Sequence, residues 1–449
     1  MNFNELRKTY QNFIYHSYEV NEDENDLIIT FNFEIENSTT FHPITKIPKH
    51  IISNKDINID FRNNLIFHIG LIEMISYYKC ACPKNIIIKA GYLDEEQIRF
   101  IKKLLYYGLG EFLYVNKIDV TEDDLVNILI DCQNKNISIP SYMGKGNLVL
   151  LGGGKDSNVT LEILKDEDNS IVIQNPKNVQ IDCAKAAGYN EDQIVKIKRT
   201  IDKELLELNK QGFLNGHTPF SSLLAFETYL VGYLMNKEFI VLSNEESANE
   251  GTVIGTKINH QYSKSYEFEN DFNNYTKKYF GINLNYFSFL RPLTEYQIGL
   301  LFSKYKKYHK VFKSCNVGSK SDSWNWCCNC PKCLFVYIIL SPFLTDEELI
   351  NIFGENLYEK EELLYTFKEI IGETGVKPFE CVGSYEEAKY AISKRITNTK
   401  GELPFLLNYY KDNYALVTDL DYEHKYNENN NLNSHFEKLL KKELEKYVL

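Results

Sequence analysis

Hydrophobic and polar positions change their period along the chain, and in the first 145 residues the changes predict both strands and helices. Residues 27–35 partly alternate between apolar and polar side chains, as a strand with one solvated face does. Asp94 is placed to cap a helix. His68 lies inside an apolar helix and is expected to be a hydrogen-bonded core histidine. The predicted elements are strands at 27–35, 86–88 and 108–114 and helices at 65–78 and 94–107.

From residue 147 to about 300, predicted strands and helices alternate. Such alternation is typical of a parallel sheet with helices on both faces. The predicted strands are 147–151, 171–175, 238–243 and 284–290, and the predicted helices lie near 157–165, 191–210 and 219–235. Later residues are mostly helical in pattern, and residues 141–146 have the composition of a linker. The predicted domains are an N-terminal α/β domain at 1–145, a second α/β domain at 146–343 and a helical C-terminal region at 344–449.

A glycine-rich turn follows the first strand of this middle part. The apolar run 148–151 leads into Gly152, Gly153, Gly154, Lys155, Asp156 and Ser157. Glycines permit close backbone approaches, and Ser157 is placed to cap the following helix. Backbone N–H groups at such a helix start favour a phosphate. The Walker A loop and the dinucleotide fingerprint both fit poorly, because Asp156 follows the lysine and Ser157 stands where a third small residue belongs. The alternative is a tight turn without a ligand.

Polar residues cluster after the predicted strands, where ligands bind in open α/β sheets. Asn244 and Glu245 follow the strand 238–243, and Arg291 follows the strand 284–290. His217 precedes the helix that leads back to 238–243. Asn259 and His260 lie in a polar loop. Solvated carboxylates, a helix-entry histidine and a salt-bridge arginine are the alternatives. The convergence of these residue types at one edge favours a site.

Four cysteines have the spacing of a metal site. Cys327, Cys330 and Cys333 form two overlapping Cys-x-x-Cys steps, and Cys315 lies upstream. Four thiolates suffice for a closed, structural tetrahedral zinc site. An iron–sulfur cluster and four reduced cysteines without metal remain alternatives, and Cys328 is a possible substitute ligand.

Composition narrows the class of protein. The 449 residues carry a formal net charge of -12, which argues against a nucleic-acid partner. No apolar run is long enough for a membrane span, and the start lacks a signal-peptide pattern. We therefore expect a cytoplasmic protein with no membrane partner, whose cysteines are reduced.

The glycine loop resembles the PP-loop of ATP pyrophosphatases, Ser-Gly-Gly-x-Asp-Ser, with Gly152 in place of the first serine. Over nearly its whole length the chain also resembles the UDP-N-acetyl-α-D-muramoyl-L-alanyl-L-glutamate epimerases (MurL). The segments that carry this second resemblance are 68–73, 108–112, 152–157, 215–217, 243–245, 259–265, 290–293, 330–333 and 377–383.

These resemblances imply a PP-loop, adenine nucleotide α-hydrolase-like fold and a reaction. The family uses ATP and Mg²⁺ to invert the terminal L-Glu of UDP-MurNAc-L-Ala-L-Glu to D-Glu for peptidoglycan synthesis. Residues 152–157 are expected to bind ATP, with Asp156 organising the loop or approaching Mg²⁺. His217, Glu245 and His260 are the acid–base candidates. Arg291, Asn244 and Asn259 are expected to bind substrate.

Other functions remain open at this point. 7-Cyano-7-deazaguanine synthases share the glycine loop and a similar cysteine cluster, although residues 1–145 have no counterpart there. A tRNA-thiolating enzyme would need a basic face, which the net charge of -12 disfavours. A nucleotide-binding module without turnover is the third alternative, and release of AMP would separate it from the enzymes.

Overall fold

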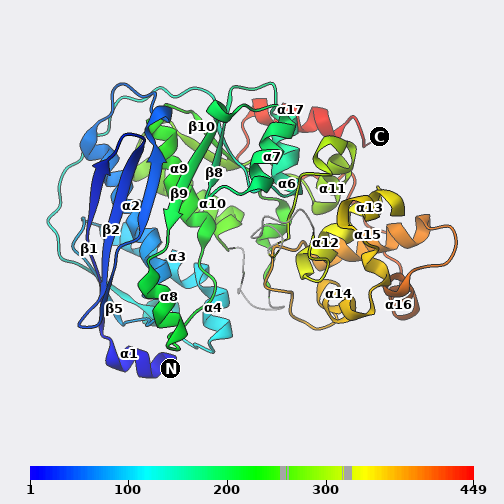
Figure 1. Cartoon of the computed structure of the whole chain (residues 1–449), viewed down its shortest axis with the longest axis horizontal. Coiled ribbons are helices and arrows are strands. Elements are labelled where there is room, and N and C mark those ends of the chain that lie inside the picture. The colour runs from blue at the N-terminus through cyan, green and yellow to red at the C-terminus, as the bar shows by residue number, and fades with distance from the viewer. Residues whose placement is uncertain (253–258, 260–261, 316, 318–325, 449) are drawn as a thin grey trace. The chain divides into compact units, whose positions relative to one another are not determined.

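The structure is a computed structural model that describes residues 1–252, 259, 262–315, 317 and 326–448. Its residues form two compact units, each made of several chain segments (Figure 1). The first unit comprises Met1–Leu148, Val195–Ile240 and Ile258–Tyr286, and the second comprises Val149–Ile194, Val241–Lys257 and Phe287–Leu449. The three-domain division with boundaries near 145 and 343 stays a prediction.

The first unit is built on a mixed sheet with the strand order β9-β4-β2-β1-β5-β6. β1 pairs antiparallel with β2 and parallel with β5, and β3 pairs with β2. The strands are β1 (Asn12–Glu22), β2 (Asp26–Ile35), β3 (Thr39–Phe41), β4 (Ile44–Pro48), β5 (Asn85–Ile88), β6 (Asn127–Ile130) and β9 (Ile194–Thr200). The helices are α1 (Phe3–Thr9), α2 (Ile59–Tyr78), α3 (Glu95–Gly108), α4 (Gly110–Val115), α5 (Glu122–Leu125), α8 (Lys203–Lys210), α9 (Phe220–Leu234) and α10 (Tyr266–Tyr279).

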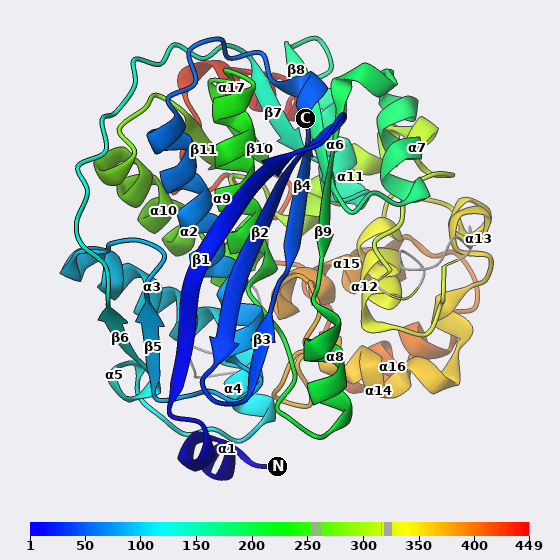
Figure 2. The same ribbon diagram turned by 60° about the vertical axis from the view of Figure 1, so that its left-hand side comes forward.

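Alternating burial explains this sheet, and a glycine explains how closely a helix approaches it. Along β2 every second side chain is buried, as the apolar–polar alternation of 27–35 predicts. Helix α2 packs against β1, β2 and α9 (Figure 2). A Cβ on Gly70 of α2 would lie 1.9 Å from the Tyr15 hydroxyl oxygen of β1. Only glycine therefore permits this approach.

Three strands cross from the first unit to the second within their own length. They are β7 (Asn147–Leu150), β10 (Phe239–Leu242) and β11 (Asn285–Ser288). With β8 (Asn169–Gln174) they have the order β11-β10-β7-β8. Their predicted positions are confirmed. The helices of the second unit are α6 (Lys155–Ile163), α7 (Asn178–Ala187), α11 (Glu295–Lys304), α12 (Pro331–Leu340), α13 (Asp346–Phe353), α14 (Leu364–Ile370), α15 (Tyr385–Asn398), α16 (Phe405–Asn413) and α17 (Ser434–Leu444).

Most predicted elements are confirmed, including the capping of α3 by Asp94 and the helical region after residue 345. Together the strands and helices give the mixed α/β class. The predicted strand at 108–114 is wrong, because these residues form α4. Its Phe112 and Leu113 are both buried, so packing outweighs the strand propensity of the aromatic residues. The single helix predicted near 191–210 is also wrong.

That segment forms β9 and then α8. Ile194, Val195 and Ile197 are buried in β9, which pairs antiparallel with β4. The expectation of a parallel sheet throughout 147–300 therefore fails at this strand. Pairing with β4, a strand about 150 residues earlier in the chain, stabilises the extended backbone of β9. The local periodicity of the sequence does not predict such a distant partner.

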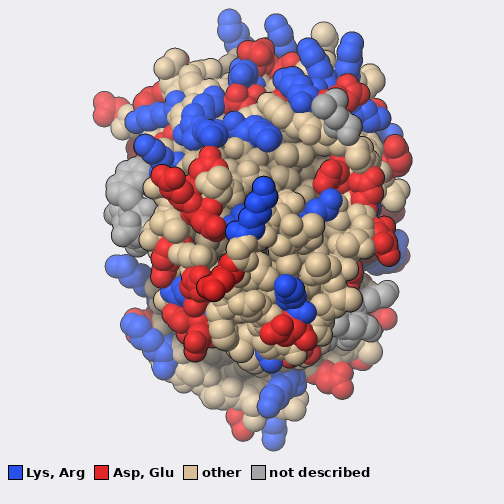
Figure 3. All heavy atoms as spheres, turned by 90° about the vertical axis from the view of Figure 1, so that its right-hand side faces the viewer, with Lys and Arg blue, Asp and Glu red and all other residues tan. Residues whose placement is uncertain are grey.

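The surface shown in Figure 3 carries charged side chains of both signs. On the face shown in Figure 3, acidic and basic side chains are interspersed among the residues drawn in colour. Within the described residues, no helix combines the length and the apolar character that crossing a bilayer requires.

Candidate functional site

The glycine loop joins β7 to α6 and needs glycine at two of its positions. Gly153 has a φ of +83°, and a Cβ there would lie 2.8 Å from Val179 Cγ1. A Cβ on Gly154 would lie 2.8 Å from Ser314 Oγ. At Gly152 a Cβ would meet nothing within 4 Å. The loop is therefore tightly packed against its own unit at Gly153 and Gly154 but leaves room beside Gly152.

Ser157 does not cap α6 in the expected way. The helix begins at Lys155, and its N-cap residue is Gly154, which offers no side chain. Ser157 lies in the first turn, where its hydroxyl accepts a hydrogen bond from Gly153 N (3.1 Å) and donates one to Gly154 O (3.1 Å). The serine thus fixes the shape of the glycine turn. A glycine at the N-cap can leave helix-start N–H groups open to an external acceptor.

Lys155 is completely buried and forms ion pairs with two carboxylates, Asp156 and Glu295. Burial alone would lower the pKa of this ammonium group, but the two carboxylates outweigh it and raise the pKa well above its usual value. Burial raises the pKa of Glu295 to about 8, against the opposing effect of Lys155 and with further increases from Asp156 and Glu245. We call Lys155, Asp156 and Glu295 the lysine cluster.

Glu295 is the member of the lysine cluster that sequence reasoning missed. It is the first residue of α11, whose N-cap Thr294 forms a capping box with Gln297. The Glu295 backbone N–H donates to Glu387 Oε1 (2.7 Å). Glu295 lies four residues after Arg291, beyond the end of β11. Arg291 was selected because it follows a strand. The same criterion, extended to the first residue of the next helix, would also have selected Glu295.

Arg291, Asn244 and Glu245 lie together in the second unit, as expected from their positions after strands. Arg291 Nη1 donates to the backbone carbonyl of Glu245 (2.8 Å), and its Nη2 donates to Ser288 Oγ (3.2 Å). Asn244 Nδ2 donates to the same Ser288 oxygen (3.0 Å). Since Arg291 is completely buried, these contacts position the Glu245 loop. Direct contact of Arg291 with substrate stays a prediction.

His217 belongs to the first unit, where an acid and a buried lysine accompany it. Its Nδ1 lies 3.6 Å from Glu111 Oε2. Lys79 donates to the carbonyl of Gly216 and, at 3.5 Å, to that of His217. Burial lowers the pKa of Lys79 to about 8. Sequence reasoning missed Lys79, which comes just after the apolar helix α2, because no local pattern distinguishes it from a surface lysine.

A pocket of about 350 Å³ in the first unit lies beside these residues. Lys79, Arg199 and Asn215 are among its polar lining residues, and Phe220 and Leu223 among its apolar ones. Such a mixture of apolar walls and a few polar groups is typical of a small-molecule site.

The remaining predicted residues have different outcomes. Asn259 is described, and its backbone carbonyl accepts from Tyr262 N (3.2 Å). His260 lies outside the described residues. His68 is a hydrogen-bonded core histidine, as expected: its Nε2 lies 2.8 Å from the Tyr275 hydroxyl. The sulfur atoms of Cys315, Cys327, Cys330 and Cys333 all lie within 4.8 Å of one another.

Comparison with protein families identifies the chain. A family model described as the MurL N-terminal domain matches residues 4–289, and one described as the MurL C-terminal domain matches residues 311–416. The chain belongs to the MurL family. The N-terminal match contains the glycine loop and residues 215–245. The C-terminal match contains all four clustered cysteines.

Three curated relatives are named as epimerases. Proteins from Xanthomonas oryzae pv. oryzae and Micromonospora sp., each named UDP-N-acetyl-alpha-D-muramoyl-L-alanyl-L-glutamate epimerase, are 34% identical over 331 residues and 31% identical over 364 residues. The first alignment covers 72% of both chains and the second covers 79% of both. A Salinispora tropica protein of the same name is 33% identical over 332 residues, 72% of this chain and 71% of its own.

Proposed function

We propose that this protein inverts the terminal L-Glu of UDP-MurNAc-L-Ala-L-Glu to D-Glu, a step in peptidoglycan synthesis. The observation that carries the proposal is membership of the MurL family across both of its domains, together with three relatives that bear this activity in their names. The substrate is accordingly a UDP-muramoyl dipeptide, and the expected location is the cytoplasm.

The chemistry requires the α-proton of a glutamate to become acidic. Removing it beside a free carboxylate would place two negative charges next to each other. We infer that the α-carboxylate oxygen first attacks the α-phosphorus of ATP and that pyrophosphate leaves. The resulting acyl adenylate has no carboxylate charge, so the α-proton can pass to a base and a proton can return on the opposite face. Water then cleaves the anhydride and releases AMP.

The glycine loop is the proposed ATP site, as in a PP-loop fold. A helix start with a glycine N-cap, open space beside Gly152 and a loop shape fixed by Ser157 all suit a phosphate group. Lys155 is already paired with Asp156 and Glu295, so its charge is compensated before a phosphate arrives. Carboxylate oxygens are the donors that Mg²⁺ prefers, and Asp156 keeps part of its side chain exposed.

Binding of Mg²⁺ by Asp156 would offset the phosphate charge and free Lys155 to bind phosphate oxygens. On this basis, Asp156 and Lys155 act together: the aspartate holds the cation and the lysine holds the anion. Glu295 then keeps the lysine in place from the side of α11. Arg291 orders the Glu245 loop beside this cluster through the Glu245 carbonyl.

Proton transfer needs one group on each face of the α-carbon. His217 is a proposed member of this pair, because Glu111 is placed to stabilise its protonated form and Lys79 fixes its loop through the Gly216 carbonyl. Glu245 and His260 are the proposed alternatives for the second member, and Asn244 and Asn259 the proposed substrate-binding amides. Replacing His217 by alanine should abolish epimerisation while leaving ATP binding intact.

The decisive experiment is an incubation with UDP-MurNAc-L-Ala-L-Glu, ATP and Mg²⁺ in D₂O. We expect AMP, D-Glu and deuterium at the α-carbon. AMP without deuterium would overturn the epimerase and favour another carboxylate-activating enzyme, such as one like 7-cyano-7-deazaguanine synthase. ATP binding by folded protein without AMP would favour a nucleotide-binding module.

A further inference from the structure

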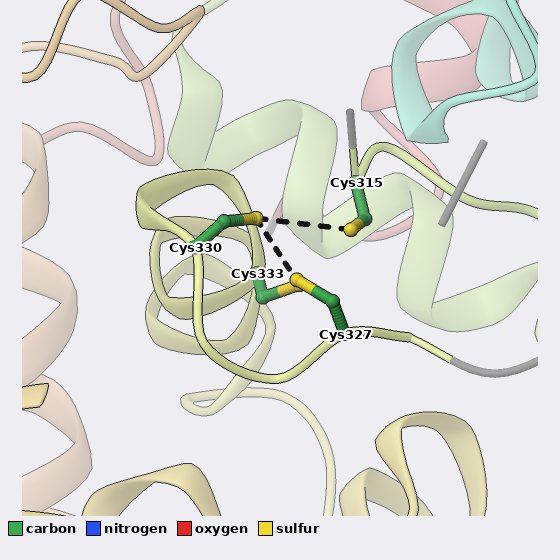
Figure 4. A group of neighbouring side chains, drawn as sticks. All are labelled: Cys315, Cys327, Cys330 and Cys333. Carbon is green, nitrogen blue, oxygen red and sulfur yellow. Dashed lines mark hydrogen bonds between the residues drawn. The ribbon is translucent and has the colours of Figure 1, made fainter. Parts of the chain in front are cut away.

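The four clustered cysteines form a compact group of sulfur atoms in the second unit (Figure 4). Cys330 Sγ lies 3.4 Å from Cys333 Sγ and 3.7 Å from Cys315 Sγ. Cys327 Sγ lies 3.5 Å from Cys333 Sγ. These separations are far longer than a disulfide bond of about 2 Å. None of the four cysteines is in a disulfide bond, and their side chains point toward a common centre.

The distances match those of a tetrahedral metal site. Zinc binds cysteine sulfur at about 2.3 Å, which places two sulfurs of a tetrahedron roughly 3.8 Å apart. We propose that Cys315, Cys327, Cys330 and Cys333 bind one zinc ion. Binding releases the thiol protons and gives four zinc–thiolate bonds, with no change of oxidation state. Since all four positions are filled by protein, the site has a structural role and leaves no place for substrate.

This zinc would fasten the start of α12 to the segment that packs on the glycine loop. Cys330 is the N-cap residue of α12, and Cys333 lies in its first turn. Cys315 comes from the separate segment 312–315. In that segment Lys313 N donates to Gly153 O (3.0 Å), and Ser314 Oγ packs against Gly154. Cys315 is thus adjacent in sequence to Ser314, which contacts the glycine loop.

We therefore infer a second consequence, which rests on the proposed ATP site: zinc holds the glycine loop in its binding shape. Without the metal, the segment 312–315 loses its link to α12. The backbone bond from Lys313 to Gly153 would then be weakened, and the carbonyl of Gly153 would be free to turn. Loss of zinc should accordingly weaken ATP binding as well as the local fold.

Cys328 provides a matched control within the same stretch. It lies between two of the proposed ligands in sequence, but its Sγ donates to the carbonyl of Phe353 (3.1 Å) and it is not a member of the group. Cys328→Ser retains a donor for that carbonyl. Cys330→Ser removes a ligand from the proposed tetrahedron.

The first measurement is the metal content of the full chain, purified under reducing conditions without added metal. We expect about one zinc per chain in the wild type and in Cys328→Ser, and a large loss in Cys330→Ser. Exchange with Co²⁺ should give the intense visible absorption of a tetrahedral thiolate site. Iron with a cluster spectrum, or no bound metal in folded protein, would overturn the proposal.

The second measurement is the affinity for ATP with Mg²⁺, before and after removal of the metal with a chelator. We expect at least about a tenfold loss on removal and recovery when Zn²⁺ is returned (a tenfold change is about 1.4 kcal/mol). Unchanged affinity in zinc-free protein would overturn the link to the glycine loop. Absence of ATP binding in zinc-loaded wild type would instead count against the proposed function, so the two failures are distinguishable.

Discussion

Two buried ion-pair clusters, one in each unit, differ in how the cation contacts its carboxylates. In the first unit Arg199 faces Glu73, with Nε donating to Oε2 (2.7 Å) and Nη2 to Oε1 (2.8 Å). Arg199 Nη2 also donates to Ser76 Oγ (3.2 Å). Both oxygens of Glu73 therefore accept from one guanidinium in a two-point pair, and the carboxylate of Glu227 also acts on the charge of Arg199.

The lysine cluster of the second unit has a different geometry, because a single ammonium group contacts two separate carboxylates. A third, Glu245, is near enough to raise the pKa of Glu295. A closed two-point pair, in which one guanidinium holds both oxygens of a carboxylate, is a structural device. A cluster in which one ammonium group is shared between carboxylates can exchange one of them for a ligand or a cation. The geometry of buried charges, more than burial itself, therefore separates a structural pair from a candidate site.

Breaking the closed pair should give the largest effect, and the effect should be on stability. Arg199→Met leaves Glu73 buried without its partner, and such a loss costs about 3–5 kcal/mol of unfolding free energy. Chemical denaturation of the full chain measures it. The control is Arg99→Met, whose exposed pair with Glu95 spans 3.9 Å and should change stability by less than about 1 kcal/mol. Equal stability of the Arg199 variant and the wild type would contradict a structural role for the pair.

Breaking the lysine cluster should affect activity, and it should also lower stability because Glu295 loses its buried cation. Lys155→Met removes the charge proposed to bind phosphate, and loss of one electrostatic group at a reacting centre lowers turnover by about 10²–10³-fold. AMP release and D-Glu formation, assayed in parallel, should both fall. The matched control is Lys165→Met just beyond α6, whose half-exposed lysine pairs with Glu162 (3.0 Å) and should leave both rates unchanged. Full AMP release by the Lys155 variant would remove this residue from the ATP site.

His68 is a third kind of buried group, because no carboxylate is among the groups that shift its pKa. Burial lowers the pKa of His68 from 6.5 to about 4. Between these values the unfolded chain binds more protons than the folded one. The contribution of the neutral histidine to stability should therefore be fully present above pH 6.5. The free energy of unfolding should fall by roughly 3 kcal/mol as the pH is lowered from 6.5 to 4.

Denaturant midpoints measured across this pH range test the histidine. His68→Gln keeps a polar group opposite Tyr275 but cannot titrate, so the contribution of this site to the pH dependence should disappear. If the two proteins lose stability in parallel over the same range, the titrating group lies elsewhere.

Local sequence patterns determined a large part of the fold. The alternation in 27–35, the cap at Asp94 and the short apolar strands were all confirmed, because each depends on neighbours within a few residues. The glycine loop and the cysteine spacing could also be recognised from the sequence, because the residues of each motif are contiguous or nearly contiguous. The two elements that were predicted wrongly, α4 and β9, depend on packing and pairing with distant residues.

For the candidate site, the sequence by itself selected the glycine loop, Arg291, Glu245 and His217, because turn chemistry and strand ends are visible in one dimension. Only the tertiary structure joined Glu295 to Lys155, placed Lys79 on the His217 loop, and left Cys328 outside the group of four cysteines that the sequence had selected. The physical reason is that a buried charge or a thiol acquires its role from partners that chain folding supplies, and those partners lie up to 140 residues away in sequence.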